Sequence, residues 1–144
     1  MLTDILNAFK LPKPSALRTD DAKLAMAALL VRLARADENY DQVEKDMIIQ
    51  LLENRYDLET VDAKSLRAQA EVLEQKAPDT IRFTKLIKDT VPYEDRRSVV
   101  RDLWSIVLAD GTRDAGENAM MRMMANLLGV NDRDSAFARQ SIDK

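Results

Sequence analysis

Apolar residues recur at helical spacing along almost the whole chain. Between residues 24 and 34 the only polar residue is Arg32, so this stretch is apolar on nearly every side, as is typical of a helix in the middle of a bundle. Alternation of apolar and polar residues, which would predict strands, is scarce. Breaks at proline and glycine divide the remainder into amphipathic segments. The pattern predicts helices at 20–36, 41–55, 59–76, 80–89, 93–109, 114–128 and 132–141.

Some inner faces can be assigned from the same spacing. The predicted helix 59–76 is more charged and is expected at the surface; its apolar residues include Val61, Leu66, Ala70 and Leu73. In the predicted helix 41–55 the inner face holds Val43, Met47, Ile48, Leu51 and Leu52.

The first nineteen residues differ from the rest. The stretch MLTDILNAFKL places Met1, Leu2, Ile5, Leu6 and Phe9 on one helical face, and a connector containing two prolines follows it. We interpret the stretch as a short helix docked on the core, with a weak membrane-surface or partner-binding helix as the alternative. The length of 144 residues suits one domain. We therefore predict an all-α, single-domain bundle of seven to eight helices over 1–144, with an N-terminal helix and connector (1–19), a core (20–130) and a C-terminal helix (131–144).

The core contains an internal repeat. ADENYDQVEKDMIIQLL aligns with ADGTRDAGENAMMRMMA at an offset of 73 residues, and apolar positions upstream and downstream stay in register. Both copies carry the pattern A-D-x-x-x-D-x-x-E, at 36–44 and 109–117, which we call the first and second acidic segments. The matched acids are Asp37 with Asp110, Asp41 with Asp114, and Glu44 with Glu117. Each half is thus an αα-hairpin, and the two are expected to be related by a pseudo-twofold axis.

Helix capping accounts for part of this acidic pattern. The second Asp and the Glu of each segment are three residues apart at a predicted helix start, which is the spacing of a capping box. Capping does not account for Asp37 and Asp110, because each lies at the C-terminal end of a helix, where the local potential is already negative. A local turn, in which Asp hydrogen-bonds its own loop, remains open for these two residues.

The second interpretation is a site for a divalent cation. Six carboxylates brought together by the repeat would repel one another unless a cation or arginine balanced them. Oxygen ligands favour Ca²⁺, Mg²⁺ or Mn²⁺. An EF-hand is excluded, because its sixth loop position would be Gln42 or Ala115 and its twelfth Ile48 or Met121. The third interpretation is catalysis by a metal-bound water.

Composition excludes several classes of function. The chain has no Cys and no His, which removes thiolate chemistry, disulfides, zinc sites of the usual kind and His-based catalysis. The net charge is −3 and no basic stripe is present, so nucleic-acid binding is not expected. No segment suggests an organic cofactor, a signal peptide or a membrane span. The absence of Cys fits a reducing cytoplasm.

Two phrases, LARADENYDQVEKDMI and IVLADGTRDAGENAMMRMMANLLGV, resemble the TerB-like family, which includes bacterial tellurite-resistance proteins and the N-terminal domain of membrane-anchored DnaJ-like proteins. The resemblance covers about residues 22–130. It implies a helical bundle with an internal pseudo-twofold and a divalent cation bound at acidic turns. The matching positions are Asp37, Asp41, Glu44, Asp110, Asp114 and Glu117. The first copy departs from the pattern, with Glu38 and Asn39 after its first Asp.

The resemblance further implies a non-enzymatic role in stress and tellurite resistance, in the cytoplasm or at the inner face of the membrane. A chain without Cys cannot reduce tellurite with its own thiols, so such a role would act through a protein partner or a peripheral membrane complex. A metal-dependent hydrolase with aspartate ligands and a structural oligomerisation module are the alternatives. The sequence sets neither the oligomeric state nor the partner.

Overall fold

The computed structural model describes residues 19–36, 40–76, 80–109 and 115–142, and the regular structure in these ranges is entirely helical. Each of the seven predicted helices is found there, with its ends within one residue of the prediction. The helices are α2 (Thr19–Arg35), α3 (Gln42–Tyr56), α4 (Thr60–Lys76), α5 (Ile81–Thr90), α6 (Tyr93–Ala109), α7 (Ala115–Leu127) and α8 (Asp132–Ile142). The all-α prediction is therefore confirmed, whereas the helix predicted from Met1 to Phe9 lies outside the described residues.

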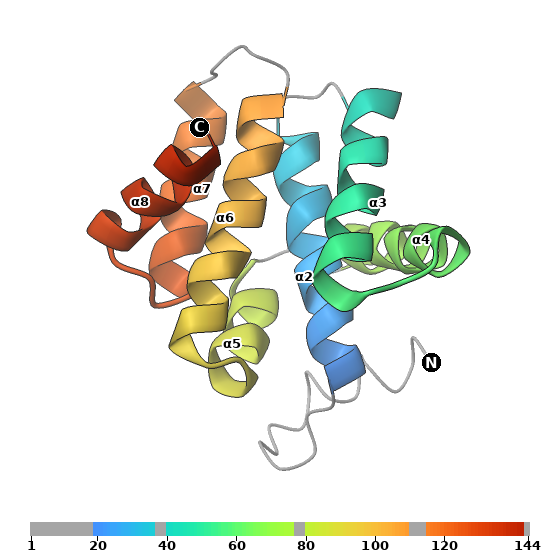
Figure 1. The fold of residues 1–144 in the computed structure, drawn as a ribbon, viewed down its shortest axis with the longest axis horizontal. Helices are drawn as coiled ribbons and strands as arrows, with labels where there is room; N and C mark the ends of the chain where they lie inside the picture. The colour runs from blue at the N-terminus through green and yellow to red at the C-terminus, as the bar shows by residue number, and fades with distance from the viewer. Residues whose placement is uncertain (1–18, 37–39, 77–79, 110–114, 143–144) are drawn as a thin grey trace.

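Helix α2 is the central element of the bundle. It packs against α3, α4, α5, α6 and α7, and its residues from Leu24 to Ala34 are buried except for Arg32. Full burial of an aliphatic side chain contributes about 1.5–3 kcal/mol relative to exposure. An apolar surface on all sides of one helix therefore requires neighbours on all sides, which Figure 1 shows around α2.

The sequence repeat is also a structural repeat. Helices α2 and α6 lie side by side and run in the same direction, and α3 and α7 return from them on either side (Figure 1). Helix α3 packs on α6 as well as on α2, and α7 packs on α2 as well as on α6. The first residues of α3 and α7, Gln42 and Ala115, are 73 positions apart, which is the offset of the sequence repeat.

One residue assigned to an inner face is in fact exposed. Val43 is 62% exposed, so this assignment is wrong. It lies in the first turn of α3. Side chains on a helix lean toward its N-terminus, so an apolar residue in the first turn can project beyond the neighbouring helices even when its spacing matches the buried face.

Left-handed backbone conformations end α3 and α7. Gly129 has φ +75, and the N–H of Val130 donates to the carbonyl of Ala125 at 2.9 Å, which closes the end of α7 as expected for a glycine at this position. A Cβ on Gly129 would lie 3.0 Å from Nη1 of Arg96, which itself donates to the Leu128 carbonyl. At the end of α3 the residue with the left-handed backbone conformation is Asp57, with φ 53.

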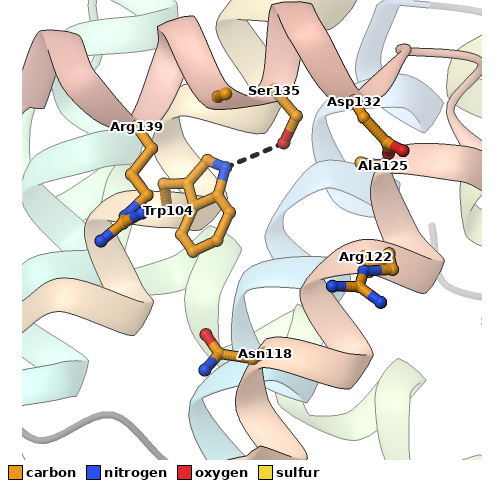
Figure 2. A pocket seen from close by; sticks show the side chains of 8 residues that line it. Trp104, Asn118, Arg122, Ala125, Asp132, Ser135 and Arg139 are labelled. Carbon is orange, nitrogen blue, oxygen red and sulfur yellow. Dashed lines mark hydrogen bonds between the residues drawn. The ribbon is translucent and has the colours of Figure 1, made fainter.

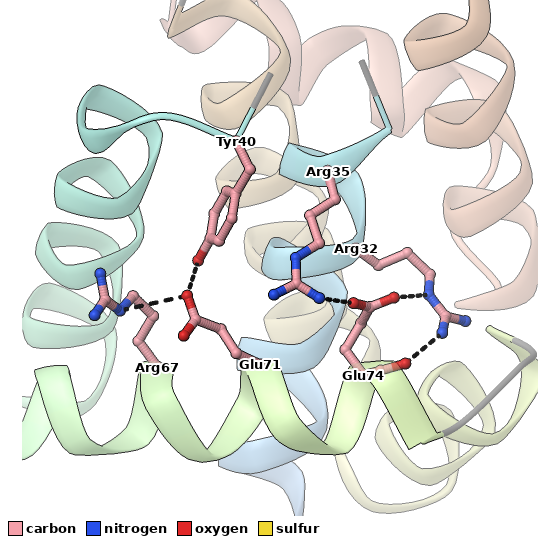
Figure 3. Close-up of polar contacts among 6 residues, drawn as sticks. All are labelled: Arg32, Arg35, Tyr40, Arg67, Glu71 and Glu74. Atoms are coloured by element: carbon pink, nitrogen blue, oxygen red, sulfur yellow. Dashed lines mark hydrogen bonds and ion pairs between the residues drawn. The ribbon is translucent and has the colours of Figure 1, made fainter. Parts of the chain in front are cut away.

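Helix α4 is joined to α2 by a group of ion pairs (Figure 3). Nε of Arg32 lies 3.1 Å from Oε2 of Glu74, and Nη1 of Arg35 lies 2.6 Å from Oε1 of the same carboxylate. Arg32 also donates to the Glu74 backbone carbonyl at 3.0 Å and to the Thr80 hydroxyl at 3.2 Å. Because Arg32 is only 11% exposed, its charge depends on these partners.

Gly129→Ala should lower the free energy of unfolding by about 1–2 kcal/mol, because an L-residue is strained at this positive φ and its Cβ meets the side chain of Arg96. Asp57→Gly should act in the opposite direction, by about 0.5 kcal/mol, because it relieves the same strain at the end of α3. Urea denaturation of both variants measures the difference. Equal stability of Gly129→Ala and the wild type would contradict the left-handed end of α7.

Glu74→Gln should cost about 2 kcal/mol in the free energy of unfolding, because it leaves two arginines of α2 without their carboxylate. The control is Asp89→Asn, which removes a carboxylate from the exposed Lys85–Asp89 pair and should cost less than about 0.5 kcal/mol. Urea denaturation compares the two, and equal losses would show that burial does not govern the strength of the α2–α4 pair.

Candidate functional site

Of the six predicted ligands, Asp41 and Glu44 can be placed in the structure. Asp37, Asp110 and Asp114 lie outside the described residues. Glu117 falls in the first turn of α7, and its side chain is likewise outside the described part of the chain.

Asp41 is the N-cap of α3. Its backbone is extended, with φ −98, and its Oδ1 accepts a hydrogen bond from the N–H of Glu44 at 3.1 Å. This is the bond expected from the capping-box spacing, and the prediction that Asp41 begins the helix is confirmed. The carboxylate is exposed, and no described residue contacts its second oxygen, Oδ2. Capping therefore uses one of the two oxygens that Asp41 could offer to a cation.

Glu44, the second predicted ligand that can be placed, is buried, with 3% of its surface exposed. It occupies the first turn of α3, where the helix dipole favours a negative charge. Removal from water is costly for a carboxylate unless hydrogen bonds or an opposite charge replace the solvent. The first acidic segment thus presents one exposed carboxylate and one buried carboxylate at the start of the same helix.

The helices that flank the two acidic segments converge at one end of the bundle. The last turns of α2 and α6 and the first turns of α3 and α7 all lie at the upper end in Figure 1. This follows from the parallel arrangement of α2 and α6, because parallel helices place their C-terminal ends on the same side. The distance between the two segments themselves lies outside the described residues.

Tyr40 fixes the chain immediately before Asp41. Its hydroxyl donates to Oε2 of Glu71 on α4 at 2.5 Å (Figure 3), and the guanidinium of Arg35 lies 5.1 Å from the centre of its ring. Burial, followed by the hydrogen bond to Glu71 and the charge of that carboxylate, raises the pKa of Tyr40 well above its ordinary value. The hydroxyl therefore stays protonated near neutral pH and continues to donate this bond.

Tyr40 is not among the site residues predicted from the sequence. The available signal was an aromatic residue within an acidic stretch, with Arg35 and Lys45 each five positions away. Both cations contact the ring, Lys45 at 5.2 Å from its centre. The Glu71 partner comes from a separate helix, so local sequence could not have identified it.

The described part of the chain contains no group of three or more His, Cys, Asp or Glu residues arranged to hold a metal ion. A cation bound near Asp41 and Glu44 would therefore need ligands from residues 37–39 or from the second acidic segment. In the described residues the start of α3 is capped by Asp41 and fixed by the hydrogen bond of Tyr40 to Glu71. The carboxylates of Asp41 and Glu44 lie at the end of the bundle where α6 ends and α7 begins (Figure 1).

Comparison with known proteins identifies the family. The sequence model of the family described as "Tellurite resistance protein TerB" matches residues 23–140, which is more than four fifths of the chain. No curated protein and no solved structure matches the chain at a significant level. The family match spans both copies of the repeat and all or most of each described helix, so the chain belongs to the TerB family.

Proposed function

We propose that this chain is a non-catalytic TerB-like module that binds a divalent cation between its two acidic segments and acts through a protein partner. The observation that carries the proposal is the convergence of the four flanking helix ends, with Asp41 and Glu44 at the start of one of them (Figure 1). The remaining ligands would be Asp37, Asp110, Asp114 and Glu117. Carboxylates gathered in this way are stabilised when a cation balances their repulsion.

Chemistry restricts the cation and the role. All of these ligands are oxygen atoms, which favours Ca²⁺, Mg²⁺ or Mn²⁺ over softer metals. A chain without Cys has no thiol with which to reduce tellurite, and an oxyanion is repelled by carboxylates. Any contribution to tellurite resistance or stress response is therefore indirect. We propose that the module acts in the cytoplasm. None of the described helices has the length and apolar content needed to cross a bilayer.

A hydrolase would require a cavity for substrate next to the acids. Two pockets formed by the described residues are lined by other segments, and neither includes Asp41 or Glu44. An oligomerisation module would require an apolar surface concentrated in one place. Among the described residues, no helix carries more than two of the large exposed apolar side chains: Val43, Val61, Val72, Ile81, Met123 and Phe137. Neither observation gives direct support to a hydrolase or to an oligomerisation module.

Cation binding should raise the melting temperature of EDTA-treated protein. A ligand present at 100 times its dissociation constant stabilises the folded state by about 2.7 kcal/mol. Ca²⁺, Mg²⁺ and Mn²⁺ would be titrated in turn and followed by thermal denaturation. The stabilisation should be lost in Asp110→Asn, which removes one charge from the second acidic segment. The proposed site is wrong if none of the three ions shifts the melting temperature.

Asp41→Asn separates cation binding from helix capping, because Asn caps a helix about as well as Asp but lacks the charge. Without cation, Asp41→Asn should match the wild type within about 0.5 kcal/mol, whereas Asp41→Ala should lose about 1 kcal/mol. With cation, Asp41→Asn should lose most of the added stability. Asp57→Asn, the same change at the other end of α3, should keep it. Full cation stabilisation in Asp41→Asn would show that Asp41 is a cap and not a ligand.

A further inference from the structure

Helices α6, α7 and α8 enclose a pocket of ≈ 460 Å³ that the acidic segments do not contribute to (Figure 2). This volume is within the range of small-molecule sites. Asn118 and Arg122 of α7 lie across the opening from Trp104 and the residues of α8. The lining residues are Trp104, Asn118, Arg122, Ala125, Asp132, Ser135, Ala136 and Arg139.

The indole of Trp104 is held in place as one wall of this pocket. Its Nε1 donates to Oγ of Ser135, which is buried, at 3.0 Å (Figure 2). The guanidinium of Arg139 lies 5.6 Å from the centre of the ring, which is the range of a cation–π contact. A flat apolar surface fixed in this way binds a ligand without first paying the entropy of ordering its own side chain.

The two arginines of the pocket lack acidic partners. Within the described residues, neither Arg122 nor Arg139 forms an ion pair, and the buried Nε of Arg139 has no hydrogen-bond partner. A buried donor without an acceptor is unfavourable in a folded protein, and a bound ligand is one way to satisfy it. In this chain the other half-buried arginines of α2 and α3 do pair with carboxylates, as Arg32 and Arg55 show.

Charge restricts the class of ligand. Two arginines and Asp132 give the lining a formal charge of +1. A monoanion neutralises this charge. The arginine fork pairs with a carboxylate through two parallel hydrogen bonds. The indole, with the methyl groups of Ala125 and Ala136, offers apolar contact to the rest of the molecule.

We propose that the pocket between α6, α7 and α8 binds a small organic carboxylate with a flat apolar body, held by Arg122 and packed beside Trp104. This site is separate from the proposed cation site, and its occupation does not depend on a bound metal. The carboxylate of the ligand lies beside Arg122 of α7, and its apolar body lies beside the indole of Trp104.

Trp104 is the chain's single tryptophan, so its fluorescence and its indole N–H resonance report on this pocket alone. Sodium benzoate, titrated into the EDTA-treated full chain, should shift the indole N–H signal saturably with a dissociation constant on the order of 1 mM. Benzamide, which has the same shape without the charge, should bind at least about tenfold more weakly.

Arg122→Gln should weaken benzoate binding at least about tenfold, because it removes the fork that holds the carboxylate. The side chain of Arg122 is exposed, so this change should not disturb folding. Arg133→Gln is the matched control, since Arg133 lies on α8 against Phe137 and outside the pocket lining, and it should bind benzoate as the wild type does. Absence of a saturable shift, equal binding of benzamide, or equal losses in the two variants would each overturn the proposal.

Discussion

The fold depends on the burial of α2. A helix that is apolar on every side has no face that can remain in water, so the remaining helices must surround it. Helices α3 to α7 each contact it, and α6 lies along it in the same direction. This parallel arrangement places the ends of both hairpins at one end of the molecule (Figure 1). The position of the helix ends that flank the two acidic segments is thus a consequence of where the apolar surface of α2 must be covered.

A carboxylate of α4 balances the arginines that interrupt and end the apolar run of α2. Arg32 interrupts the apolar run, and its guanidinium is balanced by Glu74 of α4. The same helix, α4, supplies Glu71, whose carboxylate accepts a hydrogen bond from Tyr40 in the first acidic segment (Figure 3). One surface helix therefore satisfies the charge of α2 and fixes the start of α3. Tyr40 directly precedes Asp41 in the chain. A change in the packing of α4 would therefore also change the position of Asp41.

Much of this could be predicted from the sequence, because the strongest signals are local. Helix limits followed from spacing, proline and glycine, and the Asp41 cap and the left-handed Gly129 followed from residue type at a helix end. The error at Val43 arose because periodicity gives the direction of a side chain and not the length of the neighbouring helix. Contacts between distant segments, such as Tyr40 with Glu71, depend on how helices cross, which the pattern of one helix does not contain.

The two copies of the repeat differ at positions that line the pocket. At the offset of 73 residues, Trp104 of α6 corresponds to Val31 of α2, and Arg122 of α7 corresponds to Ile49 of α3. In the first copy both residues are buried, because they contribute to the core. In the second copy a larger aromatic residue is half exposed and an arginine is exposed at the equivalent positions. Here α8 packs against α6 and α7 and borders the pocket (Figure 2). The two copies thus share their acidic pattern but differ at one position before it, on α6, and at one position after it, on α7.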